Sequence, residues 1–353
     1  MSEVLIHTHG SGKLGSKIGH ISLNRPKAIH SLTMEMCEAM IAALLEWRDN
    51  AEVKAVVIDH AEGRGFCAGG DVTLLRNSAL EDGGKTGRAF FHTEYQLNHL
   101  LFTFPKPVVA FMDGITMGGG VGISQPARYR VVTENTRYAM PETGIGLICD
   151  VGGGWYLSRL PGQLGKFLGL TGARLDGSEC LWAGLGTHYL DSSATAEAKA
   201  RISEDPGQIE AILEELSVEP PEPRLRGNMD NINRLFEGDT LAEIMDALQA
   251  DGGEWATKEL KTLRSKSPMT CALVLRQLRE GVRASTFAEN MTMEYRAAGR
   301  AIMLPDFAEG VRALIVDKTG DPQWKPAKVA DIDPKAVDAV FAPLPPEQEW
   351  KPL

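Results

Sequence analysis

The chain has 353 residues, of which 43% are hydrophobic and 24% charged, and these proportions are near the averages of soluble globular proteins. No apolar run reaches the roughly eighteen residues that a membrane-spanning helix needs, which argues against an integral membrane protein. The net charge of −10 argues against sequence-independent binding of nucleic acid, because such binding depends on clustered lysine and arginine.

The amino-terminal sequence and the cysteines give indications of the cellular compartment. The opening segment MSEVLIHTHGSGKLG shows neither a basic region before an apolar core nor an arginine-rich amphipathic pattern. The five cysteines are widely scattered, odd in number and without a C-x-x-C pair, so we expect neither a disulfide framework nor a structural zinc site. We therefore expect a cytoplasmic protein, although a processed protein of an organelle matrix would look the same.

Strands and helices alternate in the first half of the chain. The apolar runs AVVID (55–59) and PVVAFMDG (107–114) are typical of buried strands, and each leads into a loop that contains glycine. Helices are expected over 33–48 and roughly 86–103, the first of them capped by Thr33. Apolar residues recur at helical spacing in that first stretch, at Met36, Met40, Ile41, Leu44 and Leu45. The alternation predicts an α/β fold.

The second half of the chain has a different texture. After residue 190 the sequence becomes polar and helix-prone and is then interrupted by prolines. We expect a core over residues 1–200 and a helical C-terminal region over 201–353. The last segment, FAPLPPEQEWKPL, is typical of an exposed proline-rich tail.

Some short motifs imitate well-known sites without meeting their requirements. The segment GSGKLGSK (10–17) has His7 and Leu14 where a phosphate-binding loop needs Gly and Ser or Thr. The segment GISQP (122–126) has Pro126 where a serine-hydrolase nucleophile turn needs its second Gly. The eight histidines include no H-E-x-x-H or comparable spacing, so we expect no catalytic metal.

Two glycine-rich loops are better candidates for a functional site. GRGFCAGGD (63–71) and GITMGGGVG (114–122) each follow an expected strand. Glycine lets a substrate approach the backbone without meeting a side chain, and two N–H groups from separate loops can hold one developing oxyanion. Ordinary tight turns are the alternative explanation of the same pattern.

Two acidic residues lie close together in MPETGIGLICDVGGGWYL (140–157). Glu142 follows a proline, and Asp150 comes eight residues later, after an apolar run. Desolvation among apolar neighbours raises the pKa of a carboxyl group and fits it for acid or base chemistry. Asp150 could instead be the N-cap of a helix that begins after it. A nucleophilic thiol, Cys67 or Cys149, is a further alternative.

These motifs together resemble the crotonase (enoyl-CoA hydratase/isomerase) superfamily. ISLNRPKAIHSL, GRGFCAGGDV, MDGITMGGGVGIS and YAMPETGIGL occur in that family's order and spacing. The segments EYQLNHLLFTFPKPVVAFMDG, MPETGIGLICDVGGGWYLSRLPG, MTMEYRAAGR and DFAEGVRALIVDKTGDPQWKP look most like its 3-hydroxyisobutyryl-CoA hydrolase branch. The resemblance extends over nearly the whole chain.

The resemblance implies a fold, a ligand and a set of contacts. The fold is a spiral of ββα units with a helical C-terminal region, and the ligand is an acyl-CoA. Its thioester carbonyl is expected between the N–H groups of Gly70 and Gly119. The nucleotide part of CoA is expected at Arg25, Lys27, Ala28 and Ala68. The family needs no cofactor apart from the CoA of its substrate, and a homo-oligomer is compatible with it.

The choice of reaction depends on Gly122. Hydratases of this superfamily carry one catalytic Glu just after the glycine triplet, where this chain has Gly122, and a second one at the position of Glu142. The hydrolase pattern instead has Asp150, and it places Glu94 of the E-Y-x-L-N helix near the acyl group. A solvated helix face is the alternative for Glu94.

The sequence therefore predicts hydrolysis of a short 3-hydroxyacyl-CoA thioester, with Glu142 and Asp150 catalytic and with Glu94, Gly119, Glu142 and Asp150 in contact with the acyl group. Valine catabolism is the pathway that the resemblance implies. Hydration, isomerisation or another crotonase-type reaction of an acyl-CoA is the first alternative. A non-catalytic acyl-CoA-binding protein is the second.

Overall fold

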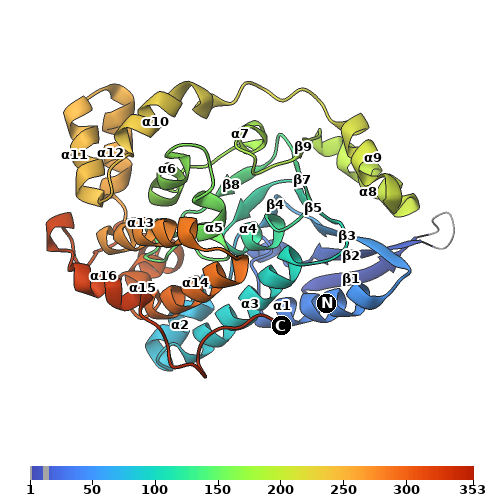
Figure 1. The fold of residues 1–353 in the computed structure, drawn as a ribbon, viewed down its shortest axis with the longest axis horizontal. Coiled ribbons are helices and arrows are strands. Elements are labelled where there is room, and N and C mark those ends of the chain that lie inside the picture. Colours follow the sequence, from blue (N-terminus) through green and yellow to red (C-terminus); the bar gives the residue numbers. More distant parts are fainter. Residues whose placement is uncertain (1, 11–15) are drawn as a thin grey trace.

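The protein is built on two sheets that the chain visits in turn (Figure 1). The structure is a computed structural model and describes residues 2–10 and 16–353, so most of the segment that imitates a phosphate-binding loop lies outside the described residues. The strands are β1 Val4–His9, β2 Lys17–Leu23, β3 Val53–His60, β4 Gly65–Cys67, β5 Val108–Met112, β6 Ile115–Met117, β7 Tyr129–Val132, β8 Arg137–Ala139 and β9 His188–Tyr189.

Helices make up a larger share of the second half of the chain than of the first. Up to β9 they are α1 Met34–Asp49, α2 Val72–Glu81, α3 Lys85–Phe102, α4 Gly119–Ser124, α5 Gly153–Leu157, α6 Leu164–Thr171 and α7 Gly177–Trp182. After β9 they are α8 Thr195–Glu204, α9 Ile209–Leu216, α10 Met229–Leu235, α11 Leu241–Asp251, α12 Glu254–Arg264, α13 Pro268–Arg283, α14 Phe287–Ala301, α15 Pro305–Val311 and α16 Pro334–Phe341.

The strand order confirms the expected spiral of ββα units. The larger sheet has the order β1-β2-β3-β5-β7-β9 and the smaller one the order β4-β6-β8. The pairs β3 and β4, β5 and β6, and β7 and β8 therefore each add one strand to both sheets before a helix follows. Among the described residues, the strands pair in parallel except β1 with β2, and β8 also forms one isolated antiparallel bridge, from Tyr138 to Leu175. Each turn of the spiral thus ends in a loop at the same edge.

The expected elements of the first half are confirmed. The runs at 55–59 and 107–114 lie in β3 and β5, and the two expected helices are α1 and α3. The Thr33 side chain accepts a hydrogen bond from Met36 N and caps α1 as predicted.

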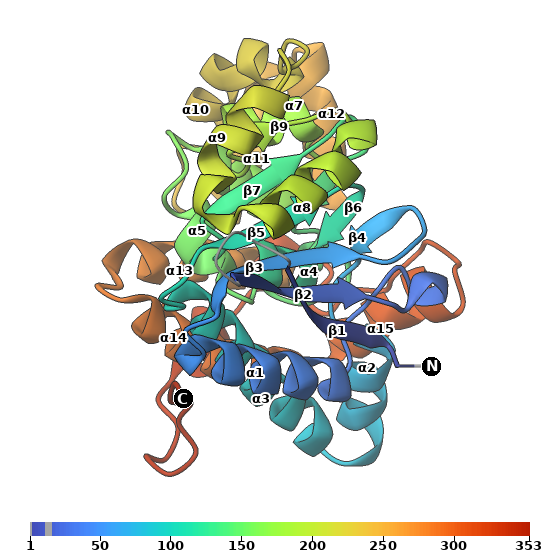
Figure 2. The same cartoon turned by 90° about the vertical axis from the view of Figure 1, so that its right-hand side faces the viewer.

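Opposite faces of the larger sheet pack against different helices (Figure 2). Along β3, Ala55 and Val57 face one way, toward α8 and α9, while Val56 and Ile58 face the main core with α1 and α3. The expected boundary at residue 200 falls inside α8, one of these covering helices. The division into 1–200 and 201–353 stays a prediction.

The C-terminal tail is packed more closely than its composition suggested. Trp350 is only 1% exposed, and its Nε1 donates a hydrogen bond to the carbonyl oxygen of His92 on α3. Glu349 forms an ion pair with Arg296 on α14 at 2.8 Å. Most of the tail lies at the surface as predicted, but Trp350 packs against α3 and α14 and attaches the tail to these helices.

An ion pair between a buried carboxyl and a half-buried lysine connects α8 to the sheet. Asp59 on β3 is 3% exposed; its Oδ2 accepts a hydrogen bond from Lys199 Nζ at 2.6 Å, and His20 Nε2 lies 2.9 Å from its Oδ1. Burial opposes ionisation of this carboxyl, but the contacts with His20 and Lys199 prevail and lower the pKa of Asp59 to about 2.

The change Asp59→Asn is expected to destabilise the fold by about 2 kcal/mol at neutral pH, since one pKa unit corresponds to ~1.4 kcal/mol. Because the folded-state pKa of Asp59 is lowered, this stabilisation is present above the ordinary aspartate pKa of about 4. It is lost as the pH falls toward 2. Urea unfolding of wild type and variant at pH 7 and pH 3 measures the difference, and an equal difference at both values would contradict the prediction.

Candidate active site

The predicted nucleotide-binding residues line one large cleft. The cleft has a volume of about 1330 Å³, and its walls include all four of them, Arg25, Lys27, Ala28 and Ala68. The Arg25 guanidinium already donates to Ser31 and forms an ion pair with Asp71 at 3.0 Å. Three further basic residues that sequence reasoning missed also line the cleft, namely Arg137, Arg174 and Lys318. Asp71, Glu81 and Asp82 also line the cleft, so five basic and three acidic side chains give it a net positive charge.

A small cavity of about 70 Å³ lies at the inner end of this cleft and shares Ala68 and Gly70 with it. Every residue predicted to touch the acyl group lines the small cavity, that is, Gly70, Glu94, Gly119, Glu142 and Asp150. The structure therefore brings together residues from four separate segments of the chain.

The two predicted oxyanion donors face each other. A Cβ built on Gly119 would lie 3.1 Å from Gly70 N and 2.6 Å from Glu94 Oε1, so a side chain here would crowd both the donor and the acid. Gly69 and Gly118, the residues before the two donors, have φ angles of 120° and 46°, which glycine adopts readily. Within the described parts of the chain, neither the Gly70 nor the Gly119 amide donates a hydrogen bond to another group. Both donors are available to a ligand.

Glu142 is a buried carboxyl with a free oxygen. It begins a 3-10 turn, Glu142–Gly144, directly after β8, and it is 5% exposed. Its Oε2 has no hydrogen-bond partner among the described residues. Burial and, secondly, the negative charge of Asp150 raise the pKa of Glu142 to about 8. A carboxylate in this setting is poorly solvated and therefore reactive toward an electrophile or a proton.

Asp150 lies between an aromatic hydroxyl and a strained turn. The Tyr95 hydroxyl of α3 donates a hydrogen bond to Asp150 Oδ2 at 2.8 Å, and burial raises the pKa of Asp150 to about 7 in spite of that bond. The capping alternative is wrong, because Gly152 is the N-cap of α5. Val151 has a φ of 53°, a conformation that costs about 1 to 3 kcal/mol for a residue with a side chain.

Glu94 is the third acid at the cavity. It is 2% exposed, which rules out the solvated helix face, and its Oε1 has no partner in the described part of the chain. Burial raises the pKa of Glu94 well above its ordinary value, and the charge of Asp150 adds to the effect. Burial and mutual repulsion disfavour ionisation of all three carboxyls together, and a protonated carboxyl can donate a hydrogen bond.

The position of Gly122 has no room for the glutamate of a hydratase. A Cβ built there would lie 2.7 Å from the Cβ of Val151 and 2.8 Å from Asn98 Nδ2. The side chains of α3 and of the loop after Asp150 occupy that space. Packing therefore requires a glycine at position 122. The same glycine leaves the chain without the second catalytic glutamate of a hydratase.

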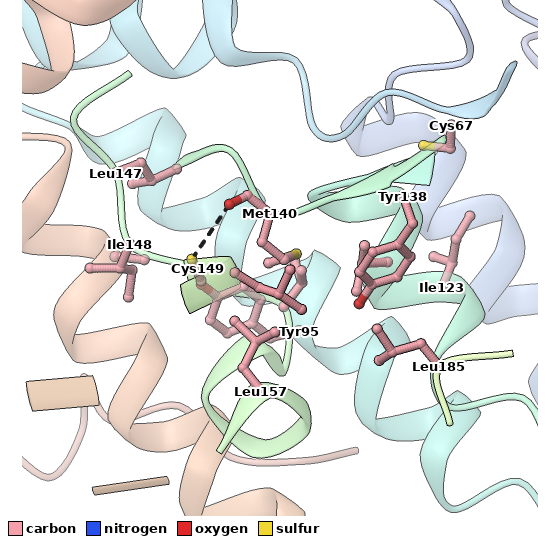
Figure 3. Close-up of a cluster of buried hydrophobic side chains, with 14 of the residues drawn as sticks. Cys67, Tyr95, Ile123, Tyr138, Met140, Leu147, Ile148, Cys149, Leu157 and Leu185 are labelled. Carbon is pink, nitrogen blue, oxygen red and sulfur yellow. Dashed lines mark hydrogen bonds between the residues drawn. The ribbon is translucent and has the colours of Figure 1, made fainter. Parts of the chain in front are cut away.

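The two neighbouring thiols are part of the core. In Figure 3, Cys149 packs among Leu147, Ile148 and Leu157, and Cys67 lies on the far side of Tyr138. Burial raises the pKa of Cys67 to about 12 and that of Cys149 well above its ordinary value. A thiol nucleophile needs an accessible thiolate, so this alternative is not supported.

Sequence reasoning assigned no role to three polar residues behind the site. Glu294 and Asn290 of α14 and Gln277 of α13 are all buried and form hydrogen bonds with one another or with the loop that follows Asp150. The motif MTMEYRAAGR contains Glu294, but only contact with a loop some 140 residues away in the sequence reveals its place.

Comparison with known families agrees with this geometry. A family model described as enoyl-CoA hydratase/isomerase matches residues 18–341. The chain belongs to the enoyl-CoA hydratase/isomerase family. Among the described residues there is no group of His, Cys, Asp and Glu that could hold a metal ion. Nor does any described helix have the length and apolar character to cross a membrane.

Similar members of the enoyl-CoA hydratase/isomerase family include named hydrolases. The mitochondrial 3-hydroxyisobutyryl-CoA hydrolase of Xenopus laevis is 41% identical over 339 residues, which is 92% of this chain and 86% of that protein. The Homo sapiens protein of the same name is 41% identical over 335 residues, with the same two shares. The crystal structure of a carnitinyl-CoA dehydratase from Mycobacterium thermoresistibile is 37% identical in sequence, with a TM-score of 0.92 and 98% of each chain covered.

The change Gly122→Ala is expected to destabilise the fold by about 1 to 3 kcal/mol, the usual range for overpacking. It should also reduce turnover, because the new methyl group pushes Val151 and hence Asp150. Thermal unfolding and the rate of CoA release measure the two effects. Gly227→Ala, at a position where a Cβ meets nothing within 4 Å, is the matched control. Equal behaviour of the two variants would contradict the packing at Gly122.

Proposed function

We propose that this protein hydrolyses a short 3-hydroxyacyl-CoA thioester, 3-hydroxyisobutyryl-CoA or 3-hydroxypropionyl-CoA, to the free hydroxy acid and CoA. The observation that carries the proposal is the cavity in which Glu142 and Asp150 lie beside the free amides of Gly70 and Gly119, with no side chain at Gly122. The names of the relatives, which match this chain over 92% of its length, support the same reaction.

In the proposed mechanism, Glu142 acts on the thioester carbonyl that the two amides polarise. Its carboxylate either attacks the carbonyl carbon and forms an anhydride, or removes a proton from a water molecule that attacks instead. The carbonyl oxygen becomes an oxyanion, and each amide donor contributes about 3 kcal/mol to its stabilisation, as in other oxyanion holes. Cleavage of the C–S bond then releases CoA as a thiolate. In the first route, water hydrolyses the anhydride, which releases the hydroxy acid, regenerates the Glu142 carboxylate and supplies the proton for the thiolate. In the second route, the hydroxy acid forms directly, and the proton that Glu142 took from water passes to the thiolate.

The size and polarity of the cavity support a short, hydroxylated acyl group. A volume of about 70 Å³ supports a short acyl group. Asp150 and Glu94 offer acceptor oxygens for a hydroxyl, and a protonated carboxyl of the set offers a donor. In this proposal Asp150 orients that hydroxyl, positions the water or transfers a proton, and Glu94 helps to hold the hydroxyl.

Hydration or dehydration of an acyl-CoA is the second candidate. The dehydratase from Mycobacterium thermoresistibile favours it, because that protein is 37% identical to this chain and carries the name of such an activity. Water addition in this family uses a second glutamate at the position of Gly122, and that position is filled by Val151 and Asn98. A non-catalytic binding protein would have no reason to bury unpartnered acids against the ligand cavity, since such burial is unfavourable.

Pathway and location follow from the resemblance and remain part of the proposal. We propose a role in valine catabolism and no cofactor beyond the CoA of the substrate. The similar hydrolases of Xenopus laevis and Homo sapiens carry the word mitochondrial in their names. We therefore propose the matrix of an organelle as well as the cytoplasm as the location of this protein.

The change Glu142→Gln is expected to lower thiol release at least a hundredfold while acyl-CoA binding stays within a few fold, because it removes the reacting oxygen and keeps the volume. The measurement follows free thiol from 3-hydroxyisobutyryl-CoA, 3-hydroxypropionyl-CoA and crotonyl-CoA, with wild type and variant side by side. Hydration of crotonyl-CoA without thiol release would overturn the proposed function. Undiminished release by the variant would overturn the role of Glu142.

The pH dependence of kcat/KM provides a separate test. Burial raises the pKa of Glu142 to about 8 and that of Asp150 to about 7, so below these values both groups are increasingly protonated. A protonated Glu142 neither attacks nor accepts a proton, so kcat/KM is expected to fall as the pH drops through 8 to 7. The two apparent values belong to the coupled set of carboxyls. If kcat/KM, after subtraction of spontaneous hydrolysis, fell only below pH 5, the result would contradict the raised pKa values of a buried site.

A further inference from the structure

The loop that carries Asp150 is held from behind by the C-terminal helices. Glu294 of α14 accepts hydrogen bonds from Gly152 N and Gly154 N, both at 2.7 Å. These two amides belong to the N-cap and to the second residue of α5, where a carboxylate also interacts favourably with the helix dipole. Glu294 therefore caps a helix that is about 140 residues distant in the sequence.

The orientation of Glu294 is fixed by two amide side chains. Gln277 Nε2 donates to Glu294 Oε1 at 3.0 Å and to the carbonyl oxygen of Cys149 at 2.6 Å. Asn290 Nδ2 donates to the same Oε1 at 2.9 Å. The Glu294 carboxylate is 0% exposed, so these bonds do not compete with water. The backbone is thus held both before and after Asp150.

The turn between these attachment points has an unfavourable local conformation. Val151 has a φ of 53°, and a β-branched residue rarely adopts a left-handed conformation. Gly152 follows with a φ of 92°. A backbone of this kind persists only where the surroundings over-determine it. The hydrogen bonds to Glu294 and Gln277 supply that restraint on one side, and the Tyr95 hydroxyl holds the Asp150 carboxyl on the other.

We propose that Glu294 is a positioning residue for Asp150. It fixes the backbone of residues 149–154 and thereby aims the Asp150 carboxyl into the acyl cavity, without touching the substrate itself. This inference rests on the proposed hydrolase function. It assigns the C-terminal helices a role in turnover and not only in folding.

The main test is Glu294→Gln, which keeps the volume but directs an NH₂ group at a backbone N–H. A displacement of about 1 Å at a reacting centre can lower a rate by roughly a hundredfold. We expect kcat for 3-hydroxyisobutyryl-CoA to fall roughly tenfold to hundredfold, with KM within threefold because the nucleotide cleft is unaffected. Glu259→Gln on α12, a buried carboxyl outside the site, is the matched control and should keep kcat within twofold.

The change Gln277→Leu tests the positioning of the loop that carries Asp150, without any change of charge. It removes the donor to Cys149 O and to Glu294, and a kcat loss of at least fivefold is expected. It also keeps the inference testable if Glu294→Gln does not fold.

The pH profile separates positioning from a loss of folded protein. The titratable groups around Asp150 are Glu94 and Tyr95 of α3, Glu142 of the 3-10 turn and Glu294 itself. Once the loop is loosened and water reaches Asp150, the acidic limb of kcat/KM should move to lower pH in both variants. A smaller fraction of folded enzyme would lower kcat and leave the limb in place.

The outcomes distinguish this inference from the proposed function. No thiol release by wild type would overturn the proposed function, whatever the variants do. Wild-type hydrolysis with kcat of both variants within twofold would overturn the role of Glu294 alone. Lower kcat with an unmoved acidic limb would likewise overturn positioning, because it would assign Glu294 a purely structural role.

Discussion

The site depends on the burial of three carboxyl groups around one small cavity. Desolvation is the largest cause of the raised pKa of Glu94, Glu142 and Asp150, and mutual repulsion adds to it for Glu94 and Glu142. Such an arrangement is unfavourable for folding, so the surrounding structure has to supply the compensating stability. The two sheets, the helices that cover them and the apolar core beneath the cavity provide it. The raised pKa values of the three carboxyls thus depend on a fold that is stable enough to keep water out of the cavity.

The spiral of ββα units explains how distant segments meet at this cavity. The smaller sheet brings the ends of β4, β6 and β8 to one edge, and Gly70, Gly119 and Glu142 each follow one of these strands within three residues. The helix α3 adds Glu94 and Tyr95 from the side. The C-terminal helices then hold the loop that follows Glu142. The segments after the strands, the helix α3 and the C-terminal helices thus each contribute different residues to the site.

Local sequence patterns predicted the parts of this structure that depend on local interactions. Thr33 and the apolar repeat after it predicted α1, and the apolar run at 55–59 predicted β3. The resemblance brought the acids and the glycine loops into one expected site, which residue spacing alone could not do. The sequence did not indicate the buried Trp350 or the contacts of Glu294, because both depend on packing between segments that are far apart in the chain.

The close fit around Gly122 also limits how this protein can change in evolution. A glutamate at that position would gain the second acid of a hydratase, but the side chains of Val151 and Asn98 already occupy the space. Such a substitution would overpack the site and destabilise the fold. A switch of reaction therefore requires prior shortening of a side chain on α3 or in the loop after Asp150. The two activities are separated by an unfavourable intermediate, although they share one fold.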